Sequence, residues 1–152
     1  GELEYAVGLA HDAGFQVMAH CSGTNNIQAA LDAGVDSVEH GYFVTEDQLH
    51  QMREQGVYWI PTFAPFYNYM TSSMATPVQQ DVLQRTLALQ GRQLAAALRL
   101  GVKVAVGSDA GAMFVPHGQA LLDEIECFVR AGVPREQALA LCRDNGGALL
   151  EA

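Results

Sequence analysis

Basic residues are scarce in this chain of 152 residues. Lys and Arg together number 8 against 17 Asp and Glu, so the formal net charge is −9, and lysine occurs only once, as Lys103. Proteins bind nucleic acid largely through Lys and Arg contacts to phosphates. The charge balance therefore argues against nucleic acid as a partner.

Long apolar runs are also missing. No run approaches the roughly 18 to 20 residues that a membrane-spanning helix needs, so we expect no membrane partner. The three cysteines, Cys21, Cys127 and Cys142, are widely spaced and form no C-x-x-C motif. This pattern argues against a disulfide framework or a structural zinc knot, and it fits a reducing cytoplasm, which we predict as the location.

The N-terminus lacks both a Met and the basic-then-apolar form of a signal peptide, since the chain begins Gly1-Glu2-Leu3. Gly1 is either a residue left by a tag or an internal cut, so we expect the chain to be part of a longer one. Hydrophobic residues make up 49% and charged residues only 16%, which excludes disorder, collagen-like repeats and coiled coil. The length alone fits one domain with a large buried surface.

A repeat of form runs along the chain. Four times, an amphipathic stretch is followed by a Gly and then by a short apolar run. A Gly just past a helix supplies the left-handed residue that ends it, and a β-branched run after it is typical of a buried strand. The glycines are Gly14, Gly34, Gly56 and Gly101, and the runs predict strands at 15–20, 35–40, 57–62 and 102–109.

Apolar residues at helical spacing predict the intervening helices. We expect Thr24 to cap one helix, and Thr45 with Gln48 forms a capping-box pattern at the start of the next. The stretch 63–77 is aromatic and predicts a loop, and long loops in compact domains are usually functional. The helices are expected at 3–10, 24–33, 46–55, 78–100, 119–131 and 135–143.

Strands that alternate with helices predict a parallel sheet with right-handed crossovers. Four strands fit two architectures, an open doubly wound sheet or part of a (β/α)8 barrel. In both architectures, functional residues gather at the carboxyl ends of the strands.

Three chemically capable residues stand at those ends. His20 closes the first run, His40 the second and Asp109 the fourth. Because neighbouring parallel strands lie about 4.8 Å apart, two imidazoles on adjacent strand ends can reach one ion at about 2.0–2.1 Å. Asp109 could bind the metal, take a proton from a metal-activated water, or both. Each residue also has a plain alternative, since a strand-end His can be a hydrogen-bonded loop residue and Asp109 can cap a turn.

Several motifs carry a family resemblance. The segment 17–41, VMAHCSGTNNIQAALDAGVDSVEHG, resembles the metal-dependent amidohydrolase superfamily, and most closely its imidazolonepropionase-like and Xaa-Pro dipeptidase-like members. The motif VAVGSDAG at 104–111 resembles the acid motif of the family's last strand, and Pro116-His117-Gly118 resembles a segment that follows it. Residues 142–150 resemble the helix that closes the barrel, where the family more often has a T-x-N-x-A pattern.

The resemblance implies a (β/α)8 barrel that hydrolyses amide, peptide or ester-like bonds with one or two divalent metal ions, usually zinc. In that family, the histidines that end strands five and six bind the metal, and they match His20 and His40. The acid that ends strand eight contacts the metal and acts as general base and acid, and it matches Asp109. Tyr42 and His117 match positions near the substrate in several relatives and are substrate-binding candidates. Alternatively, they are a surface aromatic and a loop histidine.

The sequence departs from the family in what it lacks. It contains neither the His-x-His pair of strand one nor the bridging lysine of strand four, because Lys103 lies in the last strand. Ser22 stands where many close relatives have a second His. The resemblance therefore implies that residues 1–152 are the C-terminal part of the barrel domain, with strands five to eight and their helices. A half-barrel leaves two strand edges and an inner face exposed, so we expect self-association or pairing with a missing N-terminal half.

Two functions follow as hypotheses. The first is a metal-dependent hydrolase of amide or peptide-like C–N bonds, acting on a small-molecule or dipeptide-like substrate, with Asp109 as general base. The second is a non-catalytic half-barrel fragment or interaction module that retains the scaffold. The aromatic residues of 63–69 could line a substrate pocket or pack on their own scaffold. The thiol of Cys21 is a weak candidate nucleophile, because successive strand residues point to opposite faces.

Overall fold

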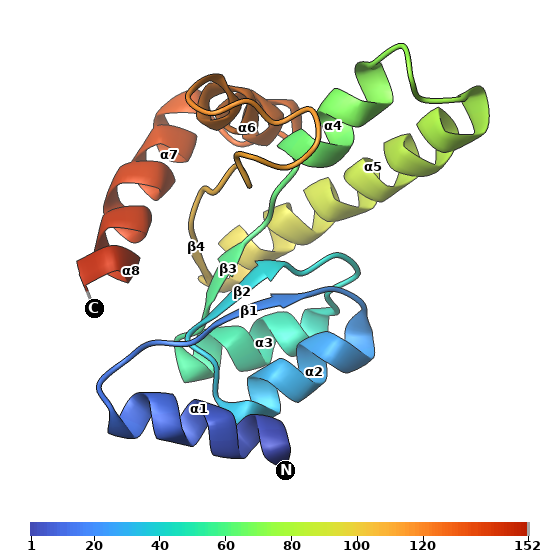
Figure 1. Ribbon diagram of the computed structural model, residues 1–152. Coiled ribbons are helices and arrows are strands. Elements are labelled where there is room, and N and C mark those ends of the chain that lie inside the picture. The colour runs from blue at the N-terminus through green and yellow to red at the C-terminus, as the bar shows by residue number, and fades with distance from the viewer. Residues whose placement is uncertain (152) are drawn as a thin grey trace.

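The computed structural model describes residues 1–151, in which four parallel strands are connected by helices (Figure 1). Neighbours in the sheet are also neighbours in the sequence, and all three pairs run parallel. The strands are shorter than the apolar runs that predicted them, because only part of each run pairs with a neighbour. They are β1 (Met18–Cys21), β2 (Ser37–His40), β3 (Tyr58–Ile60) and β4 (Lys103–Val104).

The helices occupy the connections between the strands and the C-terminal segment. Gly34, Gly56 and Gly101 adopt left-handed backbone angles just after three of them, which confirms the helix ends that the repeat predicted. Within residues 1–151, none of the helices combines the length and apolarity needed to cross a membrane. The helices are α1 (Glu2–Asp12), α2 (Thr24–Ala33), α3 (Glu46–Gln55), α4 (Ala64–Thr71), α5 (Pro77–Leu100), α6 (Gln119–Arg130), α7 (Arg135–Ala140) and α8 (Gly146–Glu151), with a π-helical turn η1 (Leu141–Asn145) before α8.

The hydrophobic core lies on the face of the sheet that α2, α3 and α5 cover. Ala19, Val38, Trp59 and Val104 form one row across the four strands, and the last three are completely buried. Strand residues alternate between faces, so this row fixes which side chains point to the opposite face. The helices contribute to the same core cluster with Ile27, Leu31, Leu49, Met52, Leu94 and Ala97.

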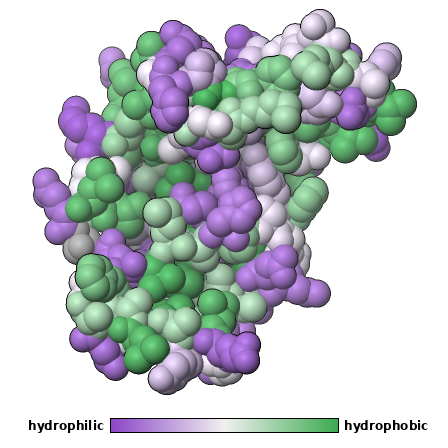
Figure 2. Space-filling view, viewed as in Figure 1, coloured by the Kyte–Doolittle hydropathy of each residue, from purple (hydrophilic) through white to green (hydrophobic). Residues whose placement is uncertain are grey.

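The opposite face of the sheet is open. His20, Glu39 and Ile60 form the next row on this face, and Met18 is 72% exposed there. Hydrophobic residues also reach the surface among polar ones on the side shown in Figure 2. This open face is the structural basis for the expected association, and the carboxyl ends of its strands carry the candidate site.

Two local predictions at the starts of helices were wrong. The stretch 63–77, predicted as a loop, contains α4, whose first turn accommodates Pro65 because the N–H that proline lacks has no partner within a helix at that position. Thr24 is not a cap but the first residue of α2, whose N-cap is Gly23. The Thr24 hydroxyl group instead donates to the carbonyl oxygen of Phe43 at 3.3 Å.

The helix predicted at 135–143 stops at Ala140 and continues as the π-helical turn η1. At the end of this turn, the side-chain amide of Asn145 donates to the carbonyl oxygen of Val104 at 2.7 Å. The contact joins the C-terminal helices to the edge strand β4.

Candidate functional site

Two histidines meet at the carboxyl ends of β1 and β2. The Nδ1 atom of His20 lies 2.7 Å from the Nε2 atom of His40, with the rings edge to face. In a regular strand, Glu39 and His40 would point to opposite faces. The left-handed backbone of His40, with φ of 64°, lets both residues line one cavity. A non-glycine residue with positive φ stores strain, which is common at functional sites.

Thr62, two residues after the end of β3, orients the ring of His40. Its hydroxyl oxygen lies 2.6 Å from the Nδ1 atom of His40, so the Nε2 atom is the one that faces His20. Burial lowers the pKa of His40, the neighbouring His20 lowers it further, and Asp109 raises it in part. The net effect favours a neutral imidazole, which is the form that binds metal ions.

Asp109 reaches the same cavity from the segment after β4. The cavity has a volume of about 290 Å³ and is also lined by His20, His40 and Glu39. Asp109, like His40, has a left-handed backbone, with φ of 56°. Burial raises the pKa of Glu39, against lowering contributions from the Ser37 hydrogen bond and from His20. Within residues 1–151, no three His, Cys, Asp or Glu side chains lie close enough together to hold one ion.

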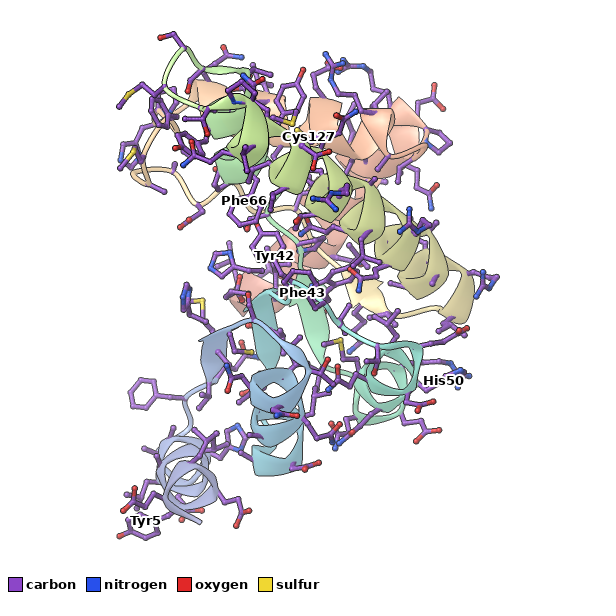
Figure 3. The ribbon with its side chains drawn as sticks, turned by 90° about the vertical axis from the view of Figure 1, so that its right-hand side faces the viewer. Tyr5, Tyr42, Phe43, His50, Phe66 and Cys127 are labelled. Carbon is purple, nitrogen blue, oxygen red and sulfur yellow. The ribbon has the colours of Figure 1, made fainter. Side chains whose placement is uncertain are left out.

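The two substrate-binding candidates occupy different surroundings. Tyr42 is buried beside the site: its hydroxyl group donates to the carbonyl oxygen of Thr62 at 2.5 Å, and its ring stacks on that of Phe66 at 4.4 Å (Figure 3). Burial raises the pKa of Tyr42, so its phenol stays protonated at neutral pH. His117 is exposed and lines a separate surface hollow with Asn68 and Phe114. The structure therefore brings Tyr42, but not His117, next to the histidine pair.

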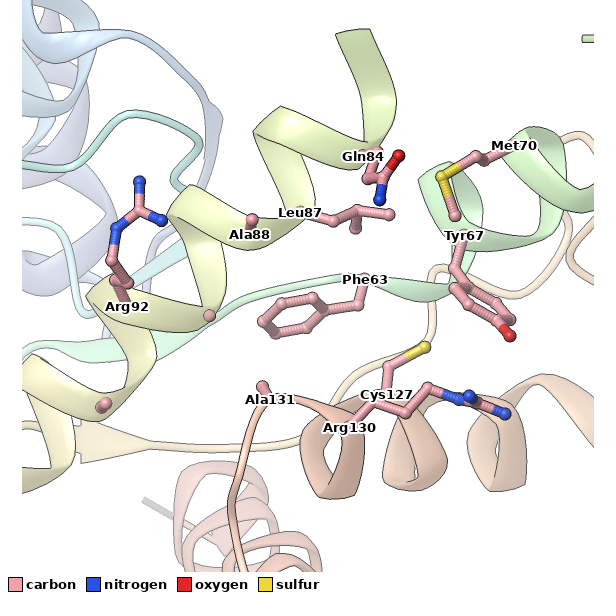
Figure 4. A pocket seen from close by; sticks show the side chains of 12 residues that line it. Phe63, Tyr67, Met70, Gln84, Leu87, Ala88, Arg92, Cys127, Arg130 and Ala131 are labelled. Atoms are coloured by element: carbon pink, nitrogen blue, oxygen red, sulfur yellow. The ribbon is translucent and has the colours of Figure 1, made fainter. Parts of the chain in front are cut away.

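A second and larger pocket, of about 580 Å³, lies between α4, α5 and α6 (Figure 4). Its walls include Phe63, Tyr67, Leu87 and Cys127, and burial raises the pKa of the Cys127 thiol to about 12. Phe63 and Tyr67 come from the aromatic stretch that was a candidate pocket lining, but none of the predicted catalytic, metal-binding or substrate-binding residues lines this pocket. Because it holds neither of the paired histidines nor Asp109, we assign the chemistry to the smaller cavity.

The sequence analysis gave no role to three further residues: Thr62, which contacts His40, Glu39, which lines the cavity, and Glu124, which binds the backbone after β3. The two-residue alternation of the strands could have placed Glu39 beside His20, and Thr62 stands at the end of the third predicted run, where β3 leads toward the site. Glu124, in the middle of α6, carries no such signal. Its contact with the chain after β3 depends on how α6 packs.

Comparison with known proteins gives a consistent family match. The model described as the amidohydrolase family matches residues 1–151. An uncharacterised protein of Mycobacterium tuberculosis is 32% identical over 146 residues, which cover 93% of this chain and 39% of that protein.

Two solved structures have the same fold over nearly the whole chain. A crystal structure of a Xaa-Pro dipeptidase with bound methionine superposes with a TM-score of 0.80 at 28% identity, covering 99% of this chain and 37% of that one. The crystal structure of ochratoxinase from Aspergillus niger superposes with a TM-score of 0.81 at 27% identity, covering 95% and 32%.

The chain thus spans well under half the length of each of these proteins. The predicted fold class, part of an α/β barrel of the (β/α)8 type, is confirmed by the parallel sheet and by these superpositions. That the chain is the C-terminal part of its domain, with strands five to eight, stays a prediction.

Proposed function

The chain belongs to the amidohydrolase family, and we propose that it carries the metal-binding edge of a metal-dependent hydrolase that cleaves amide or peptide-like C–N bonds. One observation carries the proposal. The imidazoles of His20 and His40 meet at the carboxyl ends of adjacent strands, and Thr62 fixes the orientation of the second ring. In barrels of this type, the active site lies at that end of the strands.

The chemistry of the donor set fits a divalent ion. Two imidazole nitrogens and a carboxylate are common ligands of zinc, and a set of two histidines and one acid leaves a position open for water. The pKa of His40 is lowered, which keeps its lone pair free for a metal. Because no three such groups of residues 1–151 lie close enough to hold one ion as they stand, we propose His20 and His40 as the ligands present in this chain, Asp109 of the same cavity as a third that moves toward the ion on binding, and zinc as the ion.

The residues around the proposed ion have separate roles in this mechanism. A divalent ion bound here supplies a more acidic water and a polarised substrate carbonyl. Asp109, exposed at the cavity wall, accepts a proton from the attacking water and returns it to the leaving nitrogen, as a general base and then a general acid does. Thr62 holds the His40 ring in place, and Tyr42 and Phe66 form an apolar wall beside it.

The names and lengths of the relatives suggest the class of substrate and the need for a partner. One relative is named Xaa-Pro dipeptidase and the other ochratoxinase, so we propose a dipeptide-like or other small amide substrate for the complete protein. The chain spans 37% of the dipeptidase, and so we propose that turnover requires either the rest of the barrel or a second copy. His117 remains proposed as a substrate contact only in that larger assembly.

A non-catalytic half-barrel is the second candidate function. It is favoured by the spacing of the acidic and imidazole groups, since residues 1–151 hold no cluster of three potential ligands. In this case, the scaffold would persist without bound metal.

Metal analysis separates the two candidates. The protein is purified without added metal, incubated with one equivalent of zinc and desalted, and we expect it to retain zinc while His20→Ala/His40→Ala does not. His11→Ala/His50→Ala removes the same number of imidazoles from exposed positions elsewhere and should retain zinc like the wild type. Equal zinc in all three proteins would reject the site, and none in any would favour the non-catalytic candidate.

A further inference from the structure

Glu124 is a completely buried acidic residue that the proposed chemistry does not use. It lies in α6, with 0% of its surface exposed. Its carboxyl group accepts hydrogen bonds from two consecutive backbone N–H groups, those of Phe63 at 2.9 Å and of Ala64 at 2.6 Å. Burying an ionisable group is costly unless its polar atoms are paired. The segment that follows β3 supplies the partners of this carboxyl group, which ties α6 to that segment.

The N–H of Phe63 belongs to the same peptide group as the carbonyl of Thr62. That carbonyl oxygen accepts the hydroxyl group of Tyr42 at 2.5 Å. A peptide group is planar and rigid, with its N–H and C=O directed oppositely. Glu124 and Tyr42 therefore hold the two ends of one rigid unit, and hydrogen bonds arranged in such a chain strengthen one another.

The side chain of Thr62 lies next to this peptide group and makes the contact with the histidine pair. Its hydroxyl oxygen is 2.6 Å from the Nδ1 atom of His40. Thr62 is almost fully buried, at 2% exposure, so its hydroxyl position depends on the orientation of its own peptide group. The Cα atom of Thr62 belongs to this peptide group, so a displacement of the group moves both the Tyr42 contact and the His40 contact.

We propose that Glu124 is a positioning residue for the site: by holding the Thr62–Phe63 peptide group, it sets the orientation of Thr62, and through Thr62 that of His40. The inference rests on the proposed function, in which His40 binds the metal. The side chain of Phe63 adds a second contact between α6 and this segment. Its ring packs edge to face on Phe128, one helical turn after Glu124 in α6, with ring centres 5.6 Å apart. Helix α6 thus sets the geometry of a site that it does not line.

The first test measures zinc affinity by competition with a fluorescent chelator. Glu124→Met removes both acceptor oxygens at similar side-chain length and should weaken zinc binding about tenfold or more, as loss of a group that orients a metal ligand typically does. Glu124→Gln keeps one acceptor oxygen and should lose less. The control is Gln48→Ala, which removes another buried hydrogen-bonding side chain that touches neither Thr62 nor His40. It should lower the melting temperature but leave zinc affinity unchanged.

A double-mutant cycle separates positioning from general stability. If Glu124 acts through Thr62, the zinc affinity of Glu124→Met/Thr62→Val should be no lower than that of Thr62→Val alone. Additive losses would overturn the proposal, and so would an affinity of Glu124→Met within threefold of the wild type. If Glu124→Met does not fold, the same cycle is measured with Glu124→Gln and judged by its additivity.

A metal-free measurement keeps this inference separate from the proposed function. If the wild-type chain binds no zinc, the proposed function fails, but NMR spectra without metal still report the positioning. Glu124→Gln should then shift the ring signals of His40 together with the amide signal of Phe63, whereas Gln48→Ala should shift neither. A shifted Phe63 amide with unchanged His40 ring signals would reject the positioning role.

Discussion

The Nδ1 atom of His20 lies 2.7 Å from the Nε2 atom of His40, although the two residues are 20 positions apart in the sequence. The parallel pairing of β1 and β2 creates this proximity, because it brings the ends of two successive strands side by side. At this distance, one ring donates a proton and the other accepts it, so the pair is compatible with two neutral imidazoles. If both nitrogens were to bind one zinc ion at about 2.0–2.1 Å, this hydrogen bond would be given up and the two rings would have to move apart.

Replacement of Thr62 by Val should weaken metal binding without unfolding the protein. The variant keeps the side-chain volume but removes the oxygen that lies 2.6 Å from His40 Nδ1. We expect a loss of roughly tenfold in zinc affinity and of about 1 kcal/mol in the free energy of unfolding. Chelator competition and urea denaturation measure the two quantities.

Thr86→Val is the matched control for this change, because the Thr86 hydroxyl group bonds only to the carbonyl oxygen of Val82 within α5. It should leave zinc affinity unchanged. If both variants bind zinc as tightly as the wild type, Thr62 does not orient His40 for a metal.

Gly41 should not tolerate a side chain. It directly follows His40, its φ is +59°, and an added Cβ atom would lie 2.5 Å from Trp59 Nε1, which donates to the His40 carbonyl oxygen. We expect Gly41→Ala to lower the free energy of unfolding by about 3 kcal/mol, from backbone strain together with overpacking.

Gly34→Ala separates these two causes. Gly34 has a φ of +82°, but nothing lies within 4 Å of its added Cβ atom, so only the backbone strain of about 1 kcal/mol should appear. Urea denaturation of both variants gives the comparison. Equal losses would show that contact with Trp59 is unimportant.

The parts of the fold that the sequence predicted are those that depend on local pattern. The glycines after α2, α3 and α5 and the capping box of Thr45 and Gln48 were read from short-range signals, and the structure confirms them. Helix α4 was missed because part of what fixes its start is remote in sequence, namely Glu124 of α6. The number of strands was predictable, but their short length depends on pairing.

In the candidate site, too, the sequence predicted the residues but not the contacts between them. His20, His40 and Asp109 were found because each ends an apolar run, and the structure brings all three to one cavity. That His40 has a left-handed backbone and that Thr62 contacts its ring could not be read from composition or spacing. The first depends on how the chain turns at the end of β2, and the second on the register of β2 and β3, which the sequence does not specify to a single residue.

The stability of the protein should fall as pH rises from about 4.5 to about 8. Burial raises the pKa of Glu124 to about 8 from its ordinary value of 4.5, although the N–H groups of Phe63 and Ala64 lower it in part. Between these values, the folded state holds a proton that the unfolded state has lost, so the free energy of unfolding decreases with increasing pH. The contribution is fully present below pH 4.5 and is lost above pH 8.

The difference between wild type and Glu124→Gln isolates this group from other titrating residues such as Glu39. We expect the wild type to show the steeper decline, by up to roughly 1.4 kcal/mol per pH unit, in urea denaturation at pH 5.5, 6.5 and 7.5. Glu136→Gln, at an exposed position of α7, should follow the wild type. Parallel curves for wild type and Glu124→Gln would mean that Glu124 has the same pKa in both states.

The open inner face of the sheet should make the chain associate. Met18 is 72% exposed on the edge strand β1, beside a hollow of about 500 Å³ that Ile60, Leu121 and Leu149 also line. Unpaired strand edges and apolar surface of this kind favour association. Sedimentation velocity should therefore show an average mass that rises with protein concentration, and Met18→Lys should reduce this rise.

Met74→Lys is the control for this change. Met74 is 66% exposed in the turn between α4 and α5, away from the sheet, so its replacement should leave the rise in average mass unchanged. A concentration-independent monomer that melts cooperatively would contradict association through this face, because such a protein would be stable with its inner face in water.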